Sequence, residues 1–113
     1  MRLELGNGHV QVNPTAGQIS DLLHALPGSE PDSFAILIRD EQQFMQCSGT
    51  LEEGFLLEYQ DGSLDEHFQC VDHELLLASV IWAFQAYLAD DHRWRTIFPW
   101  RRINVRQRWW KWW

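Results

Sequence analysis

The sequence predicts an α+β domain: an antiparallel sheet of about six strands, made from a hairpin and a meander, with two helices packed on one face. Short runs that alternate apolar and polar side chains are separated by turn-forming dipeptides, which is typical of antiparallel strands. Two other segments repeat apolar residues at helical spacing. The 113 residues are 45% hydrophobic and 22% charged, as expected for one globular domain.

The N-terminal part predicts a hairpin followed by a short helix. Residues 2–5 and 9–12 alternate on either side of an Asn7-Gly8 turn. Thr15 and Gln18 have the spacing of a capping box. Apolar residues then recur on one helical face, at Ile19, Leu22, Leu23 and Leu26.

A four-strand meander is predicted next. Residues 34–39 form a nearly continuous apolar run, which predicts a central strand covered on both faces. Residues 43–47 return as its partner. Residues 54–60 and 66–70 form an amphipathic pair of strands with a turn at Asp61-Gly62. In the last strand Phe68 and Cys70 share one face, and His67 and Gln69 share the other.

The longest helix is predicted after Asp72, its expected N-cap, with Val71 and Leu76 as a hydrophobic staple. Its apolar stripe is broad, so it is expected to be buried against the sheet. The helix is expected to end near residues 89–91, and residues 93–100 are expected to run back over the surface, where Pro99 prevents a continuing helix.

Residues 1–103 are therefore expected to form one domain, and residues 104–113 a basic, Trp-rich C-terminal tail. A membrane-spanning segment is not expected, because no run of about 18 apolar residues occurs. The N-terminus has no apolar signal-peptide core, which predicts a cytoplasmic location. Cys47 and Cys70 are expected to be buried free thiols.

The net charge of −7 hides a strong asymmetry along the chain. Residues 1–92 contain two Arg and all sixteen Asp and Glu, a formal charge of −14, whereas residues 93–113 carry +7. An acidic body argues against direct nucleic-acid binding, which requires cations to neutralise phosphates. It favours a basic protein partner.

Several motifs in order resemble the first-numbered immunity-protein family of bacterial polymorphic toxin systems, over about residues 9–100. The motifs are Asn13-Pro14-Thr15, Phe44-x-Gln46, Gly54-Phe-x-Leu-Glu-Tyr-x-Asp-Gly-Ser63, His67-Phe68, Ala83-Phe84-x-x-Tyr87-Leu88 and Trp94. The resemblance implies a small cytoplasmic protein that binds and neutralises a cognate toxin domain, often a nuclease or deaminase. It implies no catalytic residues, and it does not extend from Arg101 onward.

The candidate toxin-binding residues are the carboxylates on and around the amphipathic strand pair, together with one tryptophan. They are Glu52, Glu53, Glu58, Asp61, Asp65, Glu66 and Trp94. Each carboxylate has an alternative as part of a solvated polar face. Trp94 is either an interface anchor or, as favoured, a lid packed over the core. Glu58 is either exposed or partly buried and paired, with Arg39 as the candidate partner.

No metal site, cofactor or enzyme activity is expected. His67, Cys70 and His73 are closely spaced, but a strand directs residues 67 and 70 to opposite faces, whereas zinc needs convergent ligands. Adjacent carboxylates on a strand likewise point apart, and no nucleophile accompanies them. The toxin's identity and the oligomeric state stay open.

The tail provides a different candidate function. Residues 104–113 contain four Trp together with Arg and Lys, which suits self-association or binding to a membrane surface. The other interpretations are a disordered tail, a strand added to the sheet or to a neighbouring chain, and a basic tail that folds back onto the acidic strand pair of its own chain.

Overall fold

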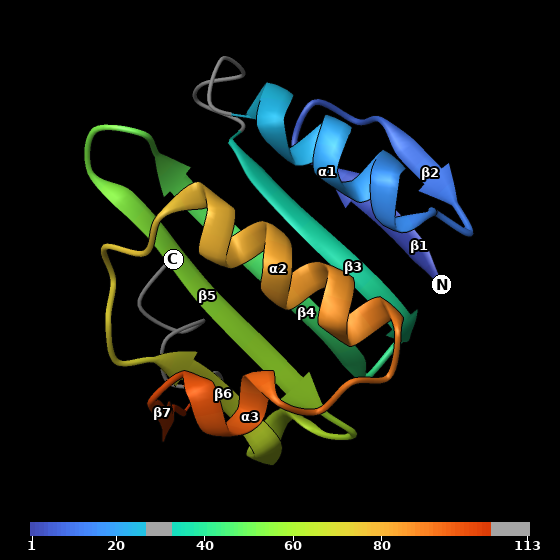
Figure 1. Ribbon diagram of the computed structural model, residues 1–113. Helices are drawn as coiled ribbons and strands as arrows, with labels where there is room; N and C mark the ends of the chain where they lie inside the picture. The colour runs from blue at the N-terminus through green and yellow to red at the C-terminus, as the bar shows by residue number, and fades with distance from the viewer. Residues whose placement is uncertain (27–32, 105–113) are drawn as a thin grey trace.

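The computed structural model describes residues 1–26 and 33–104, and the tail beyond Asn104 lies outside the described residues. Figure 1 shows the helices on one side of a single sheet. The strands are β1 (Arg2–Leu5), β2 (Val10–Val12), β3 (Phe34–Asp40), β4 (Gln43–Thr50), β5 (Gly54–Asp61), β6 (His67–Cys70) and β7 (Trp100–Arg102). The helices are α1 (Ala16–Ala25), α2 (Leu77–Leu88) and the single turn α3 (Trp94–Ile97), with a 3-10 turn, η2 (Leu64–Glu66).

The sheet is antiparallel with the order β2-β1-β3-β4-β5-β6-β7. The predicted hairpin and meander are confirmed, and the α+β class with them. The expected number of about six strands is one too low. The seventh strand was missed because Trp100–Arg102 is short and follows Pro99, where the sequence shows no alternating pattern.

Helix α1 begins as its capping box predicts. The Gln18 backbone amide donates to the Thr15 hydroxyl at 3.1 Å, and the Thr15 amide donates to the Gln18 side chain at 2.9 Å. The buried side chains of this helix are Ile19 and Leu23. The helix is therefore held by its cap and by its apolar face, although Gly17 lowers its intrinsic propensity.

Helix α2 starts four residues later than predicted, and its N-cap is Leu76 rather than Asp72. Leu75 instead forms a bridge with Phe55, in which the two backbones exchange hydrogen bonds of 2.9 and 3.1 Å. The Asp72 carboxylate accepts a hydrogen bond from the Glu74 amide and closes a turn. Asp72 thus stabilises a turn before the helix. Because Leu75 is paired like a strand residue, α2 begins only after it.

The β5–β6 connection is also longer than a two-residue turn. Gly62 has φ +90°, which suits the predicted turn, and η2 follows before β6 begins at His67. The predicted faces of β6 are confirmed, since Cys70 joins the core while His67 and Gln69 lie on the opposite side.

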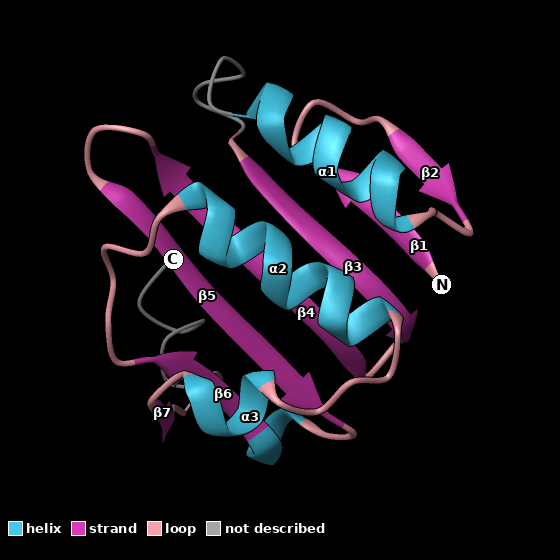
Figure 2. Ribbon diagram, in the orientation of Figure 1, coloured by secondary structure: helices cyan, strands magenta, loops and turns pink. Residues whose placement is uncertain are grey.

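Figure 2 shows α1 and α2 in front of the sheet. The core between them and the sheet is built from the helix-facing side chains of every long strand, including Leu3, Leu37, Met45, Phe55 and Leu57. No described helix covers the other face of β3, where Phe34 is 41% exposed. The expectation that β3 is covered on both faces is therefore wrong for the described part of the chain. None of the helices in that part is long and apolar enough to cross a membrane.

Candidate functional site

The structure distributes the seven candidate residues over four places. Glu52 and Glu53 lie in the turn between β4 and β5. Asp61, Asp65 and Glu66 lie at or beyond the other end of β5. Glu58 is buried in the middle of β5, and Trp94 is buried in the core. The sequence therefore predicted a single acidic site where the structure has separate groups with different surroundings.

The turn with Glu52 and Glu53 is fixed against the segment that precedes α2. The Phe55–Leu75 bridge joins the two chain segments. Gly54, with φ +87°, lies so close to Glu74 that a Cβ atom on it would sit 2.6 Å from the Glu74 Cα. Only glycine meets both conditions without displacement of the backbone. The conformation of this surface turn is therefore fixed by its contacts with the segment that precedes α2.

We call this surface the acidic end, defined by four exposed carboxylates and three exposed apolar side chains: Glu52, Glu53, Asp72 and Glu74, with Leu51, Val71 and Leu76. Within residues 1–26 and 33–104, none of the four carboxylates forms an ion pair. Leu76 is 74% exposed. Apolar side chains grouped on a surface with charges around them are typical of protein-binding sites.

Asp72 and Glu74 were not among the candidate residues. The sequence placed Asp72 at a helix N-cap and Glu74 in the first turn of the helix. The signal in the sequence is the position of Asp72, close after the strand pair that carries the candidate carboxylates. Recognising it would have required the Phe55–Leu75 pairing, which is a long-range contact.

The carboxylates near the other end of β5 are largely neutralised. Arg95 pairs with Asp61 at 3.4 Å, and Arg102 pairs with Glu66 at 3.1 Å. Both arginines come from the segment after α2. The strand pair has no cation near it in the sequence, but the fold brings these two arginines to its carboxylates. Asp65 is exposed and forms no ion pair with another described residue.

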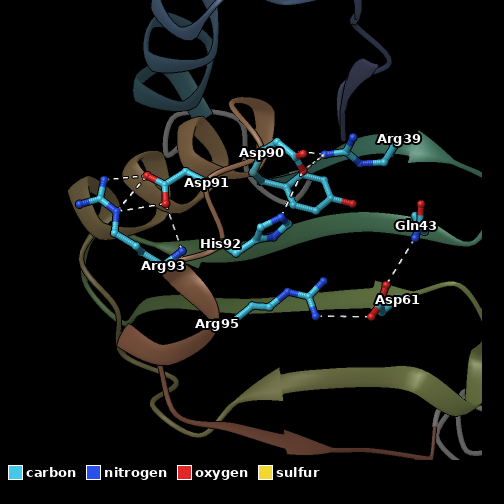
Figure 3. Close-up of polar contacts among 9 residues, drawn as sticks. Arg39, Gln43, Asp61, Asp90, Asp91, His92, Arg93 and Arg95 are labelled. Atoms are coloured by element: carbon cyan, nitrogen blue, oxygen red, sulfur yellow. Dashed lines mark hydrogen bonds and ion pairs between the residues drawn. The ribbon is translucent and has the colours of Figure 1, made fainter.

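A cleft of about 210 Å³ opens at this end, between β3, β5 and the residues that follow α2. Figure 3 shows its charged side chains, with Arg39 next to Asp90 and Arg95 next to Asp61. The Arg39 guanidinium lies 5.2 Å from the centre of the Tyr87 ring and donates to the Tyr87 carbonyl at 3.2 Å. Each arginine is thus paired and stacked on an aromatic ring, which favours a structural role.

Two tyrosines of this cleft stay protonated at neutral pH. Burial raises the pKa of Tyr59, although the nearby Arg95 charge opposes it. Burial likewise raises the pKa of Tyr87 against the hydrogen bond from Arg39. Asp91 shows the opposite direction: hydrogen bonds from Arg93 lower the pKa of its carboxyl group. None of these groups has a pKa near 7, as a general base would need.

Glu58 belongs to a polar network on the face that α1 and α2 do not cover. Its carboxylate accepts from the Gln46 amide at 3.0 Å and lies 3.2 Å from His67 Nε2. His67 Nδ1 lies 3.0 Å from the Gln60 side-chain oxygen. Of the two interpretations of Glu58, the exposed one is wrong and the buried, paired one holds, with His67 in the place of the candidate partner Arg39, which instead contacts Tyr87 and Asp90.

His67 lies on the sheet face opposite the helices and is only 2% exposed. The Phe44 ring packs beside it at a centroid distance of 5.9 Å. Both ring nitrogens are occupied, one by Gln60 and one by Glu58. This arrangement resembles a structural network more than a base poised beside a nucleophile.

Trp94 lies 1% exposed at the centre of an aromatic cluster. Its ring meets Tyr59, Tyr87 and Trp100 edge-to-face at centroid distances of 4.6, 5.8 and 5.8 Å. The favoured interpretation, packing over the core, matches this position. The ring is not available to a partner at the surface.

The cysteines behave as predicted and are buried free thiols. Burial raises the pKa of Cys47 to about 12 and also raises the pKa of Cys70. Among the described residues, no group of three or more His, Cys, Asp and Glu is placed to hold a metal ion.

Comparisons with known proteins identify no relative. No protein-family model matches the chain, and no curated protein or solved structure matches it. The likeness to an immunity-protein family therefore rests on the motifs quoted above, and it stays a prediction.

Proposed function

We propose that this protein is an immunity protein that binds and neutralises a cognate bacterial toxin domain, a nuclease or deaminase, through the acidic end. The observation that carries the proposal is the acidic end itself. Its four carboxylates form no ion pair with the described residues, and exposed leucines occur in the same two chain segments. A basic toxin surface would supply both the missing charge and an apolar contact.

The mechanism is occlusion. A nuclease or a nucleic-acid deaminase needs cationic side chains to hold its substrate's phosphates. An acidic protein seated on those side chains competes with the substrate for the same charges. Association is accelerated by the −14 charge of residues 1–92, so the on-rate falls as salt is added.

The fixed conformation of the acidic end favours binding to a partner. The Phe55–Leu75 bridge and the Gly54–Glu74 contact hold the two acidic segments together before a partner arrives. Less conformational entropy is then lost on binding than for a flexible acidic loop. We place the complex in the cytoplasm, where an immunity protein meets its toxin.

The proposal predicts that the neighbouring gene encodes a large protein with a toxin-like C-terminal domain, and the test uses that domain. Co-expression of this protein should rescue cells that produce that domain, and the two proteins should copurify. The double variant Glu52→Lys, Glu53→Lys should weaken binding about tenfold or more, mainly through a lower on-rate at low salt.

The matched control is Asp21→Lys with Glu41→Lys. Both residues are exposed, lie outside the acidic end and change the net charge by the same amount. Equal effects of the two double variants would assign the binding to overall charge and remove the acidic end as the site. Failure of the unmodified protein to bind the domain and rescue the cells would overturn the function.

A further inference from the structure

The face of the sheet opposite the helices is more apolar than a solvated face should be. Antiparallel sheets that expose one face normally place polar side chains on it. Here the strand register puts apolar side chains from β2 to β5 on this face. Three are exposed and four are half-buried: Val10, Val12 and Phe34, then Ile36, Ile38, Phe44 and Leu56. We call this surface the open face, because no described helix lies over it (Figure 2).

The accessible charges on the open face nearly cancel. The charged strand residues that the register places there and that are not buried are Arg2, Glu4 and Arg101. Arg2 and Glu4 pair with each other at 3.4 Å, and Arg101 donates to the Gln69 side chain at 3.0 Å. The open face is thus almost neutral on a body whose residues 1–92 carry −14. Charge complementarity therefore favours a partner that is itself apolar and nearly uncharged.

The open face is also large enough for a stable interface. Seven strands about 4.8 Å apart span roughly 30 Å, and the eight residues of β4 or β5 extend about 26 Å. The outer strands are shorter, so the face covers on the order of 600 Å² in projection, and its accessible surface is larger because it follows the side chains. Stable complexes bury about 800 Å² on each partner. A second flat face over this one would therefore bury about the area that a stable dimer needs.

A hollow in the open face lies between β3 and β5. Its volume is about 350 Å³, and its lining includes Phe34, Ile36 and Leu56. Phe34 is itself 41% exposed. Each copy of the chain therefore offers both an exposed aromatic ring and an apolar place for one. In a two-fold symmetric contact such a pair is used twice, because each copy presents the same surface to the other.

From these observations we infer that two copies of this chain pair through their open faces as a symmetric dimer, with Phe34 of each copy in the hollow of the other. The two-fold axis then runs along β4, the central strand, so that β3 of each copy lies over β5 of the other. The sheets face each other at about 10 Å, and the helices of both copies form the outer layers. The interface uses no residue of the acidic end, and dimerisation requires no toxin.

The first test is sedimentation equilibrium of the full chain. The mass should rise from 13.4 kDa toward twice that value as the concentration increases through the micromolar range. Sodium sulfate should favour the dimer, because it screens the repulsion between two acidic bodies and strengthens apolar contacts. This salt dependence is opposite to the one expected for toxin binding. A mass that stays at 13.4 kDa up to about 1 mM would overturn the dimer.

The second test is a matched pair of substitutions. Phe34→Glu should raise the dimer dissociation constant about thirtyfold or more, since it places a carboxylate in an apolar hollow. The control is Ile97→Glu, which makes the same charge change at a 58% exposed residue of α3. Circular dichroism checks that both variants fold, and the milder Phe34→Ala should still raise the constant about tenfold. Equal effects of Phe34→Glu and Ile97→Glu would assign the association to another surface and overturn the inference.

The third test locates the axis with spin labels. Ser48 is exposed on β4 and lies opposite Phe34 in the register, close to the proposed axis. Cys47 and Cys70 are buried, so a label attaches to the introduced thiol. In the dimer, labels on Ser48→Cys should be much closer together than labels on Ile97→Cys, because α3 lies on the helix side of the sheet (Figure 1). An equal or longer distance from Ser48→Cys in a dimeric chain would exclude pairing through the open faces.

Discussion

The Glu58 carboxylate lies 3.2 Å from Nε2 of His67, and both side chains are buried on the sheet face opposite the helices. These residues occupy facing strands, since Gln60 of β5 is paired with His67 of β6. Burying polar groups in this way is tolerated only when their hydrogen bonds are made, and removal of one member leaves the other in a costly state.

Glu58→Ala should therefore lower the free energy of unfolding by about 3 kcal/mol, because it removes the acceptor used by His67 and Gln46. Urea denaturation measures the change. Glu53→Ala is the control, with an expected change within about 0.5 kcal/mol since Glu53 is exposed. A loss as small as that of the control would mean that the Glu58 network contributes nothing to stability.

Gly54→Ala and Gly62→Ala form a matched pair. Both glycines have φ near +90°, so alanine at either position is strained by about 1 kcal/mol. At Gly62 the added Cβ meets nothing within 4 Å, whereas at Gly54 it meets the Glu74 backbone at 2.6 Å. The Gly54 variant should lose clearly more stability, by roughly 2 kcal/mol or more. Equal losses would contradict the close contact between the β4–β5 turn and the segment before α2.

Trp94→Ala should cost about 3–5 kcal/mol, since it empties the centre of the aromatic cluster. Thermal and urea unfolding both report this change. Trp94→Phe keeps most of the volume and should cost less. If Trp94→Ala left stability intact and weakened only partner binding, the interface interpretation of Trp94 would replace the core interpretation.

Stability should fall as the pH rises above about 9. Burial raises the pKa of Cys47 from 9.0 to about 12. The folded state therefore keeps the Cys47 proton where the unfolded state releases it. This contribution to stability is complete below pH 9 and is lost as pH rises toward 12, at about 1.4 kcal/mol for each pH unit.

The measurement is the urea midpoint between pH 8 and pH 11. Cys47→Ala removes this titration, so the variant should show a shallower decline than the natural chain. Part of the decline should remain, because burial also raises the pKa of Cys70, Tyr59 and Tyr87. A variant with an unchanged slope would show that the Cys47 thiol is not the group responsible.

Local patterns were enough to predict most of the fold. The Asn7-Gly8 turn, the Thr15–Gln18 capping box and the alternation of residues 54–60 each fix structure within a few neighbours, and each prediction is confirmed. The start of α2 was predicted wrongly because Leu75 pairs with Phe55, a residue twenty positions away. No local pattern contains that contact.

The candidate site was harder to predict for the same reason. Charge along the chain correctly indicated acidic residues, but it could not indicate which of them meet an arginine. Arg95 and Arg102 return to Asp61 and Glu66 only because α3 and β7 follow the sheet edge. Asp72 and Glu74 join Glu52 and Glu53 only through the Phe55–Leu75 bridge.

The position of β7 at the sheet edge has a consequence for synthesis. β7 is the last strand in the described chain, and it pairs with β6, which otherwise would present unpaired amides and carbonyls along His67–Cys70. On the ribosome, β6 emerges about thirty residues before Trp100, so a nascent chain passes through a stage in which this edge is open. Exposed strand edges promote aggregation. Ribosome pausing or premature termination between α2 and β7 would therefore yield the species most prone to aggregate.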